Sequence, residues 1–397
     1  MSVANAGSGT VPKDDTSPAQ ALEQPQGTEG VDAPVEVEPR KRTARVLLPA
    51  DDGGHQLNPE KAGASPAVER DADDTDDEGD EKEDDADADG EAEEGDFLAD
   101  FPDDTDDLEL IHCRLKSLDE LRLPRFADHL KRLSLRQNAI SRLDPATFHQ
   151  LTKLEEVDLY DNKLKDVGDA FDKLGAMTSL DLSFNLLRSV PSRLESMPRL
   201  STIYFVQNKI SKISGLSSLV NLRSLELGGN KIRKIENLET LVNLEELWLG
   251  KNKITKLEGL GTLKKLKILS IQSNRITVLE GLEELESLDQ LYLSHNGIKK
   301  IEGLDHNVKL TTLDIQYNFV EKIENVSHLK ELEEFWMSGN KIPDLTSVDK
   351  ELRNIETLRT LYLEANPCQT NDRANYRRKV MLTLPQLTQI DATYVRA

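Results

Sequence analysis

The chain has 397 residues, of which 31% are charged, and its formal net charge is −23 at pH 7. Residues 69–107 carry 23 acidic and 2 basic side chains, whereas residues 108–397 carry 40 acidic and 42 basic ones, so the acidity belongs to one short block. Neither a signal-peptide pattern nor an apolar run of membrane-spanning length is present, so we expect neither secretion nor a membrane span.

The first 107 residues are rich in Ala, Gly, Pro, Asp and Glu and poor in aromatic and β-branched residues. This composition cannot bury enough apolar surface to offset chain entropy, and it predicts a disordered acidic extension over residues 1–107. Within it, "PRKRTAR" (residues 39–45) indicates either a nuclear import signal or an ordinary basic patch. Aspartates over residues 85–96 imitate the spacing of a calcium loop, but the final glutamate and flanking amphipathic helices are absent, so no metal site is predicted.

From residue 108 onward the chain repeats the pattern L-x-x-L-x-L-x-x-N-x-I, mostly at intervals of 22 residues. The repeated asparagines are Asn138, Asn162, Asn185, Asn208, Asn230, Asn252, Asn274, Asn296, Asn318, Asn340 and Asn366. One unit earlier, Cys113 occupies the asparagine position. The pattern predicts an α/β solenoid, a leucine-rich-repeat horseshoe of about 12 short repeats of the 22-residue type over residues 108–366.

The last unit departs from the repeat and predicts a C-terminal cap over residues 367–397. Tyr376, Val380 and Leu384 recur at helical spacing, so we expect a helix near residues 372–382 whose apolar face covers the final coil. A helix with a function of its own that merely follows the repeats is the alternative. Cys113 and Cys368 lie at opposite ends of the repeats, which predicts free thiols in a reducing compartment.

Side chains alternate between the two faces of a strand, so the residue between the leucines of L-x-L faces the concave side of the solenoid. This concave column consists of Glu109, Ser134, Asp158, Asp181, Tyr204, Glu226, Trp248, Ser270, Tyr292, Asp314, Trp336 and Tyr362. Five members are aromatic, five are acidic and none is basic, which favours a face that binds a protein with a basic surface. The alternative is that aromatic residues are there for their strand propensity alone.

Basic residues gather after the asparagines instead. One row is Lys209, Lys231, Lys253, Arg275 and Lys341, and a second, three residues further on, is Lys212, Lys234, Lys256, Lys300 and Lys322. A solvated edge and a nucleic-acid site are both consistent with these rows. Without interleaved exposed aromatic residues, the solvated edge is favoured.

Segments such as "LELGGNKIRKIENL", "LGKNKITKL", "EEFWMSGNKI" and "YRRKVMLTLPQLTQIDATYV" resemble the leucine-rich-repeat regulatory subunits of type-1 protein phosphatase over about residues 108–397. The resemblance implies that the concave face grips the phosphatase catalytic subunit. It implies as contact residues Asp181, Tyr204, Glu226, Trp248, Asp314, Glu334, Trp336 and Tyr362, and Tyr292 joins them from the concave column. The family often has phenylalanine where this chain has Tyr204 and Trp248, which puts the affinity in doubt more than the site.

The chain is therefore expected to be a non-catalytic regulatory subunit that controls the activity, maturation or localisation of the phosphatase. No nucleophile–base set, phosphate-binding glycine loop or cofactor motif recurs at matching repeat positions, so no cofactor is predicted. The resemblance also implies a further phosphatase inhibitor protein in a ternary complex, and residence in nucleus and cytoplasm. The alternative function is a scaffold for ribonucleoprotein or cytoskeletal assembly.

Overall fold

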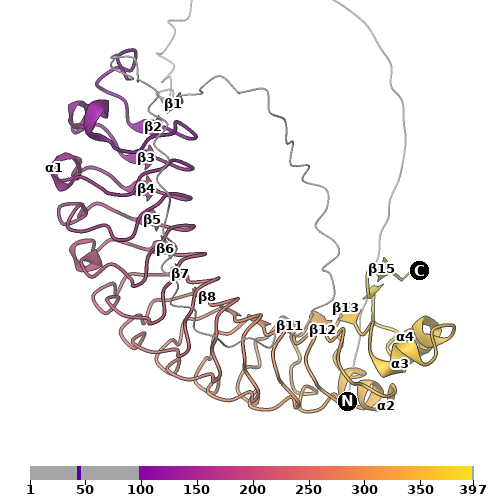
Figure 1. The fold of residues 1–397 in the computed structure, drawn as a ribbon. Helices are drawn as coiled ribbons and strands as arrows, with labels where there is room; N and C mark the ends of the chain where they lie inside the picture. The colour runs from indigo at the N-terminus through magenta and orange to yellow at the C-terminus, as the bar shows by residue number, and fades with distance from the viewer. Residues whose placement is uncertain (1–42, 46–97, 396–397) are drawn as a thin grey trace, which may run out of the picture. The chain divides into compact units, whose positions relative to one another are not determined.

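The computed structural model describes residues 43–45 and 98–395, and residues 98–395 form a curved solenoid whose strands line its inner side (Figure 1). Fifteen short strands form one sheet in the order of the sequence. The twelve repeat strands are β2 (Asp107–Glu109), β3 (Arg132–Ser134), β4 (Glu156–Asp158), β5 (Ser179–Asp181), β6 (Thr202–Tyr204), β7 (Ser224–Glu226), β8 (Glu246–Trp248), β9 (Ile268–Ser270), β10 (Gln290–Tyr292), β11 (Thr312–Asp314), β12 (Glu334–Trp336) and β13 (Thr360–Tyr362). The predicted leucine-rich-repeat solenoid of about twelve coils is confirmed.

The repeat strands pair in parallel, with equivalent residues of successive coils opposite one another. Leu225 lies opposite Leu247, and Leu247 lies opposite Leu269. All three side chains are fully buried. Because each coil is too thin to cover its own leucines, the apolar core is a continuous stack that only neighbouring coils can complete.

The repeated asparagines join each coil to the one before it. The side-chain Nδ2 of Asn230 donates to the carbonyl of Phe205 in the preceding coil at 2.8 Å and to that of Leu227 in its own coil at 3.0 Å. Its Oδ1 accepts the backbone N–H of Ile210 at 3.0 Å. Asn230 is buried, and this bridging satisfies backbone groups that would otherwise be buried without partners. The same pattern recurs at the other repeated asparagines.

The residue before each of these asparagines has a positive φ, for example +68° at Gly229 and +53° at Lys251. This left-handed residue turns the chain out of the strand toward the convex side. Turns and short helices make up the convex side (Figure 1). The helices of the coils are η1 (Asp119–Leu121), η2 (Leu123–Phe126), α1 (Pro145–Phe148), η3 (Leu194–Ser196) and α2 (Thr346–Leu352). None of the helices in the described part of the chain is long and apolar enough to cross a bilayer.

The N-terminal end of the solenoid differs from the predicted boundary. Residues 98–107, which the sequence analysis assigned to the disordered extension, pack on the first coil: Leu98 is fully buried and Thr105 is 3% exposed. The Arg125 guanidinium holds this segment by donating to the carbonyls of Leu98 and, at 2.8 Å, Phe101. In addition, β1 (Thr43–Arg45) pairs in parallel with β2. The rest of the predicted extension lies outside the described residues.

The C-terminal end is closed by α3 (Pro367–Thr370), α4 (Tyr376–Thr383), β14 (Gln389–Ile390) and β15 (Thr393–Tyr394). Tyr376, Val380 and Leu384 are buried against the last coil, which agrees with the predicted cap. The cap helix begins at Tyr376, about one turn later than expected, because Asp372 and Asn375 form a separate turn before it. Cys113 and Cys368 are both free thiols.

Candidate functional site on the concave face

The concave column lies at the ends of strands β2 to β13, with each side chain on the opposite face from the buried apolar residue before it. Ten members of the column are partly exposed. Ser270 and Asp314 are only 3% exposed, because larger neighbours cover them. The predicted alternation is therefore confirmed, and both tryptophans of the chain stand on this face, outside the leucine core.

Three aromatic residues on β10, β12 and β13 form what we call the C-terminal aromatic cluster: Tyr292, Trp336 and Tyr362. The ring centroids of Tyr292 and Trp336 are 6.1 Å apart, and those of Trp336 and Tyr362 are 6.0 Å apart. The indole Nε1 of Trp336 is inaccessible to solvent and has no hydrogen-bond acceptor among the described residues. A buried donor without an acceptor lowers the stability of the isolated protein. This donor belongs to Trp336, the central ring of the cluster.

Two carboxylates border the aromatic cluster. Burial raises the pKa of Asp314, although its Oδ1 accepts the backbone N–H of Gln316 at 2.9 Å. Glu334 lies on β12 and is partly exposed. Burial raises the pKa of the Tyr292 hydroxyl, and the negative charge of Glu334 raises it further. A cation presented here would meet both rings and acids.

The middle of the face holds Tyr204, Glu226 and Trp248 on β6, β7 and β8. Burial raises the pKa of Glu226, and the nearby charge of Asp181 raises it further. Burial also raises the pKa of Asp181 itself. Carboxylates that are desolvated in this way on a shared face gain more from an incoming cation than fully hydrated ones do.

A hollow of about 390 Å³ opens beside Trp248 and Glu226. Gly228 and Gly250, which follow strands β7 and β8, carry no side chain to fill it, and Gly229 also lines it. Residue-type counting along the concave column misses this feature. Its signal in the sequence is the pair of successive segments "LELGGN" and "LWLGKN", in which the residues after the second leucine are glycines.

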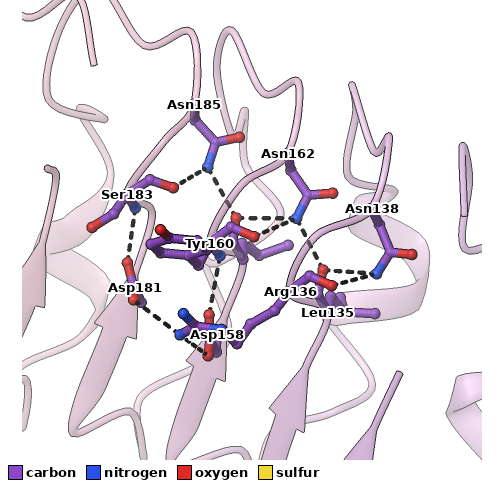
Figure 2. A network of polar contacts seen from close by, with 10 residues as sticks. Leu135, Arg136, Asn138, Asp158, Tyr160, Asn162, Asp181, Ser183 and Asn185 are labelled. Carbon is purple, nitrogen blue, oxygen red and sulfur yellow. Dashed lines mark hydrogen bonds and ion pairs between the residues drawn. The ribbon is translucent and has the colours of Figure 1, made fainter. Parts of the chain in front are cut away.

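Arg136 pairs with two neighbouring acidic members of the column, Asp158 and Asp181 (Figure 2). Its Nη1 lies 2.9 Å from Asp158 Oδ2 and 3.8 Å from Asp181 Oδ2. The guanidinium also lies over the ring of Tyr160, 4.1 Å from the ring centroid, and Tyr160 in turn packs at 4.8 Å on Phe184, which is 40% exposed. Arg136, which belongs to the coil before that of Asp158, therefore compensates part of the charge of these two acids.

The nine predicted site residues thus share one face but fall into two groups. Asp181, Tyr204, Glu226 and Trp248 lie on neighbouring strands β5 to β8, and Tyr292, Asp314, Glu334, Trp336 and Tyr362 lie on β10 to β13. Buried Ser270 on β9 lies between the two groups. Among the described residues, no cluster of three or more His, Cys, Asp or Glu side chains is arranged to hold a metal ion. Rings beside desolvated carboxylates suit the binding of a large basic surface.

Sequence-family comparison matches residues 128–187 and 177–232 to a family described as "Leucine rich repeat", and residues 220–262 and 264–306 to one described as "Leucine Rich repeats (2 copies)". The chain is 46% identical over 97 residues to protein phosphatase 1 regulatory subunit SDS22 of Saccharomyces cerevisiae, covering 24% of this chain and 28% of the relative. It is 59% identical over 46 residues to protein phosphatase 1 regulatory subunit 7 of Mus musculus, covering 12% of each. The matched segments thus span less than a third of either relative. These relatives are named as regulatory subunits and not as enzymes.

Solved structures with the same architecture include an internalin of Listeria monocytogenes, at a TM-score of 0.58 and 22% identity over 72% of this chain and 86% of that one. A leucine-rich-repeat protein of Leptospira interrogans matches at a TM-score of 0.58 and 23% identity over 73% of this chain and 84% of that one. At this level of identity the likeness concerns the fold alone.

Proposed function

We propose that this leucine-rich-repeat protein, whose sequence is similar to regulatory subunits of protein phosphatase 1, is a non-catalytic subunit that binds the catalytic subunit of type-1 Ser/Thr protein phosphatase through its concave face. The relatives carry that role in their names. For this chain, the role and the mode of binding are our inference. In this proposal the solenoid controls the activity, maturation or localisation of the enzyme.

The observation that carries the proposal is the C-terminal aromatic cluster, whose central Trp336 has a buried N–H without an acceptor. Protein interfaces concentrate their binding energy in buried tryptophan and tyrosine anchors surrounded by complementary charge. The raised pKa values of Asp181, Glu226 and Asp314 supply that complement, since all three rise because of burial and each would fall again beside a cation. A basic partner surface therefore fits both halves of the site.

Titration calorimetry with purified type-1 catalytic subunit tests the proposal. Trp336→Ala and Trp248→Ala should each weaken binding by about 2 kcal/mol or more, because each removes an anchor that the partner buries. Val242→Ala is the matched control, because Val242 is 48% exposed on the turn before β8, away from the concave column, and its loss should leave affinity unchanged. Failure of the wild-type protein to bind the catalytic subunit would overturn the proposal. Equal affinities of the three variants would mean that Trp336 and Trp248 are not binding anchors.

The finer parts of the proposal need separate measurements. Phosphatase activity assayed with and without the solenoid distinguishes inhibition from neutral tethering. Affinity purification followed by mass spectrometry tests whether a further phosphatase inhibitor protein joins a ternary complex, and imaging of the tagged chain tests residence in nucleus and cytoplasm. If the affinity purification recovers RNA and no phosphatase, and the RNA binding falls steeply with salt, the alternative of a ribonucleoprotein scaffold is favoured.

A further inference from the structure

Two rows of basic side chains run along the edge of the solenoid next to the asparagines, and they differ in whether carboxylates of the protein pair with them. The inner basic row consists of the residues directly after four successive asparagines, Lys209, Lys231, Lys253 and Arg275. Backbone bonds hold this row in register: the N–H of Lys231 donates to the carbonyl of Ile210, and that of Lys253 to the carbonyl of Ile232, both at 2.8 Å. Neighbouring members therefore stand one coil apart, about 4.8 Å along the sheet.

In the outer basic row, three residues further along each coil, Lys234 and Lys256 have carboxylate partners within the protein. Lys234 Nζ lies 3.8 Å from Glu258 of the next coil, and Lys256 Nζ lies 3.6 Å from the equivalent Glu280. These two glutamates occupy equivalent positions in successive coils, so each balances the charge of a lysine in the coil before it.

The inner basic row has no such balance. Within residues 98–395, no carboxylate pairs with any of its four members, three of which are exposed while Lys253 is partly covered. Like charges held at the coil spacing of about 5 Å would repel by roughly 1 kcal/mol per pair even in water. A row of four cations without carboxylate partners therefore favours the binding of a polyanion.

The chain contains a matching polyanion next to its first coil. Residues 71–96 hold 17 acidic side chains and one lysine, and they lie outside the described residues. The acidic block ends two residues before buried Leu98, so it is joined directly to the solenoid. An extended segment of 26 residues reaches up to roughly 85 Å, whereas the inner basic row lies about 20 to 35 Å along the sheet from β2.

We propose that the inner basic row is an intramolecular docking site for the acidic block of residues 71–96. Covalent attachment gives that block an effective concentration on the order of millimolar at the row, which an external polyanion would have to exceed. Nucleic acid is the other class of polyanion. It is disfavoured because the only aromatic residue between positions 206 and 277 is Trp248, which stands on the concave face and offers no base-stacking surface beside the row.

Zero-length carbodiimide cross-linking of the full chain, read by mass spectrometry, tests this proposal, because the reagent joins a carboxylate to a lysine only on contact. Cross-links from residues 71–96 should concentrate on Lys209, Lys231 and Lys253, with little product on Lys234 and Lys256. The Lys234–Glu258 pair provides an internal positive control. The product should fall roughly tenfold at 1 M salt, since the screening length drops from about 10 Å at 0.1 M to about 3 Å. A mixture of isotopically light and heavy chains identifies cross-links between molecules.

Two matched variants complete the test. Lys231→Gln/Lys253→Gln/Arg275→Gln should abolish cross-linking of the acidic block to the remaining Lys209, whereas Lys234→Gln/Lys256→Gln in the outer row should preserve it. Cross-links spread evenly over all exposed lysines, or formed only between molecules, would overturn the proposal. A second result would also overturn the proposal: tight, salt-sensitive binding of a single-stranded oligonucleotide to the wild-type chain, lost in the inner-row variant but kept in the outer-row variant, with no cross-links from the acidic block. The inner basic row would then be a nucleic-acid site.

Discussion

The indole of Trp336 lies edge-on to the ring of Tyr362, with centroids 6.0 Å apart and an interplanar angle of 67°. This contact joins the last two strands of the repeat, β12 and β13, through their concave side chains. The Trp336 Nε1 is buried, and its hydrogen has no acceptor within the described part of the chain. A partner's acceptor can therefore reach this donor only where the indole turns outward on binding.

The substitution Trp336→Phe isolates this donor, because it retains an aromatic ring and deletes the N–H. Binding of the phosphatase catalytic subunit should weaken by about 1 kcal/mol, the net value of one hydrogen bond. The melting temperature of the free protein should stay the same or rise, since a buried unsatisfied donor has been removed. Parallel calorimetric titration and thermal unfolding measure the two effects. Unchanged affinity would mean that no acceptor meets the indole.

Asp314→Asn should stabilise the free protein at neutral pH. Burial raises the pKa of Asp314, so the folded state binds this proton more tightly than the unfolded state does. Protonated Asp314 therefore adds to the stability of the wild-type protein below the ordinary carboxyl pKa of about 4. This contribution is lost as the pH rises through the raised pKa of the folded state. Thermal unfolding should therefore show a higher melting temperature for the variant at pH 7, with the difference vanishing at low pH. Exposed Asp305→Asn serves as the control, and an equal gain there would refute the argument from burial.

Adjacent residues on β8 should respond in opposite ways. Leu247 is fully buried between Leu225 and Leu269, so Leu247→Ala should lower the free energy of unfolding by about 2–5 kcal/mol through a cavity. Trp248→Ala should change stability much less while weakening partner binding. Urea unfolding followed by circular dichroism gives the stability values. A larger loss of stability at Trp248 than at Leu247 would mean that the indole belongs to the core.

Asn230→Ala should be more damaging than its small change in volume suggests. The substitution strips the carbonyls of Phe205 and Leu227 of a donor and the N–H of Ile210 of its acceptor. Leaving such groups buried without partners should cost at least about 2 kcal/mol. Partly exposed Asn243, whose amide donates to the Val220 carbonyl at 2.8 Å, offers a milder comparison, Asn243→Ala. Similar urea midpoints for the two variants would contradict a structural role for the buried asparagine.

The repeat period was sufficient to predict the register of the strands, the buried leucines and the direction of the concave column. Period and side-chain alternation depend only on each residue's own place in its coil, and that is why Trp248 and Trp336 could be assigned to one face. The same period indicated the cap, because Tyr376, Val380 and Leu384 stop following the strand pattern and follow a helical one.

Features that depend on the neighbouring coil escaped the sequence reading. The pairing of Arg136 with Asp158, and the burial of Asp314, arise from side chains that meet only after stacking. The hollow beside Trp248 required glycines of two consecutive coils to coincide. At the N-terminal end, composition alone placed residues 98–107 with the acidic extension, although buried Leu98 and the Arg125 hydrogen bonds hold that segment on the first coil.

The position of the C-terminal aromatic cluster beside the cap couples binding to the integrity of one end of the molecule. A solenoid whose coils touch only their neighbours loses structure from its termini inward, one coil at a time. Fraying of the cap would release Tyr362 first and Trp336 next, before any coil in the middle of the arch is disturbed. Partner affinity should therefore decline on mild heating before bulk unfolding begins, and a bound partner should act as a clamp on this end.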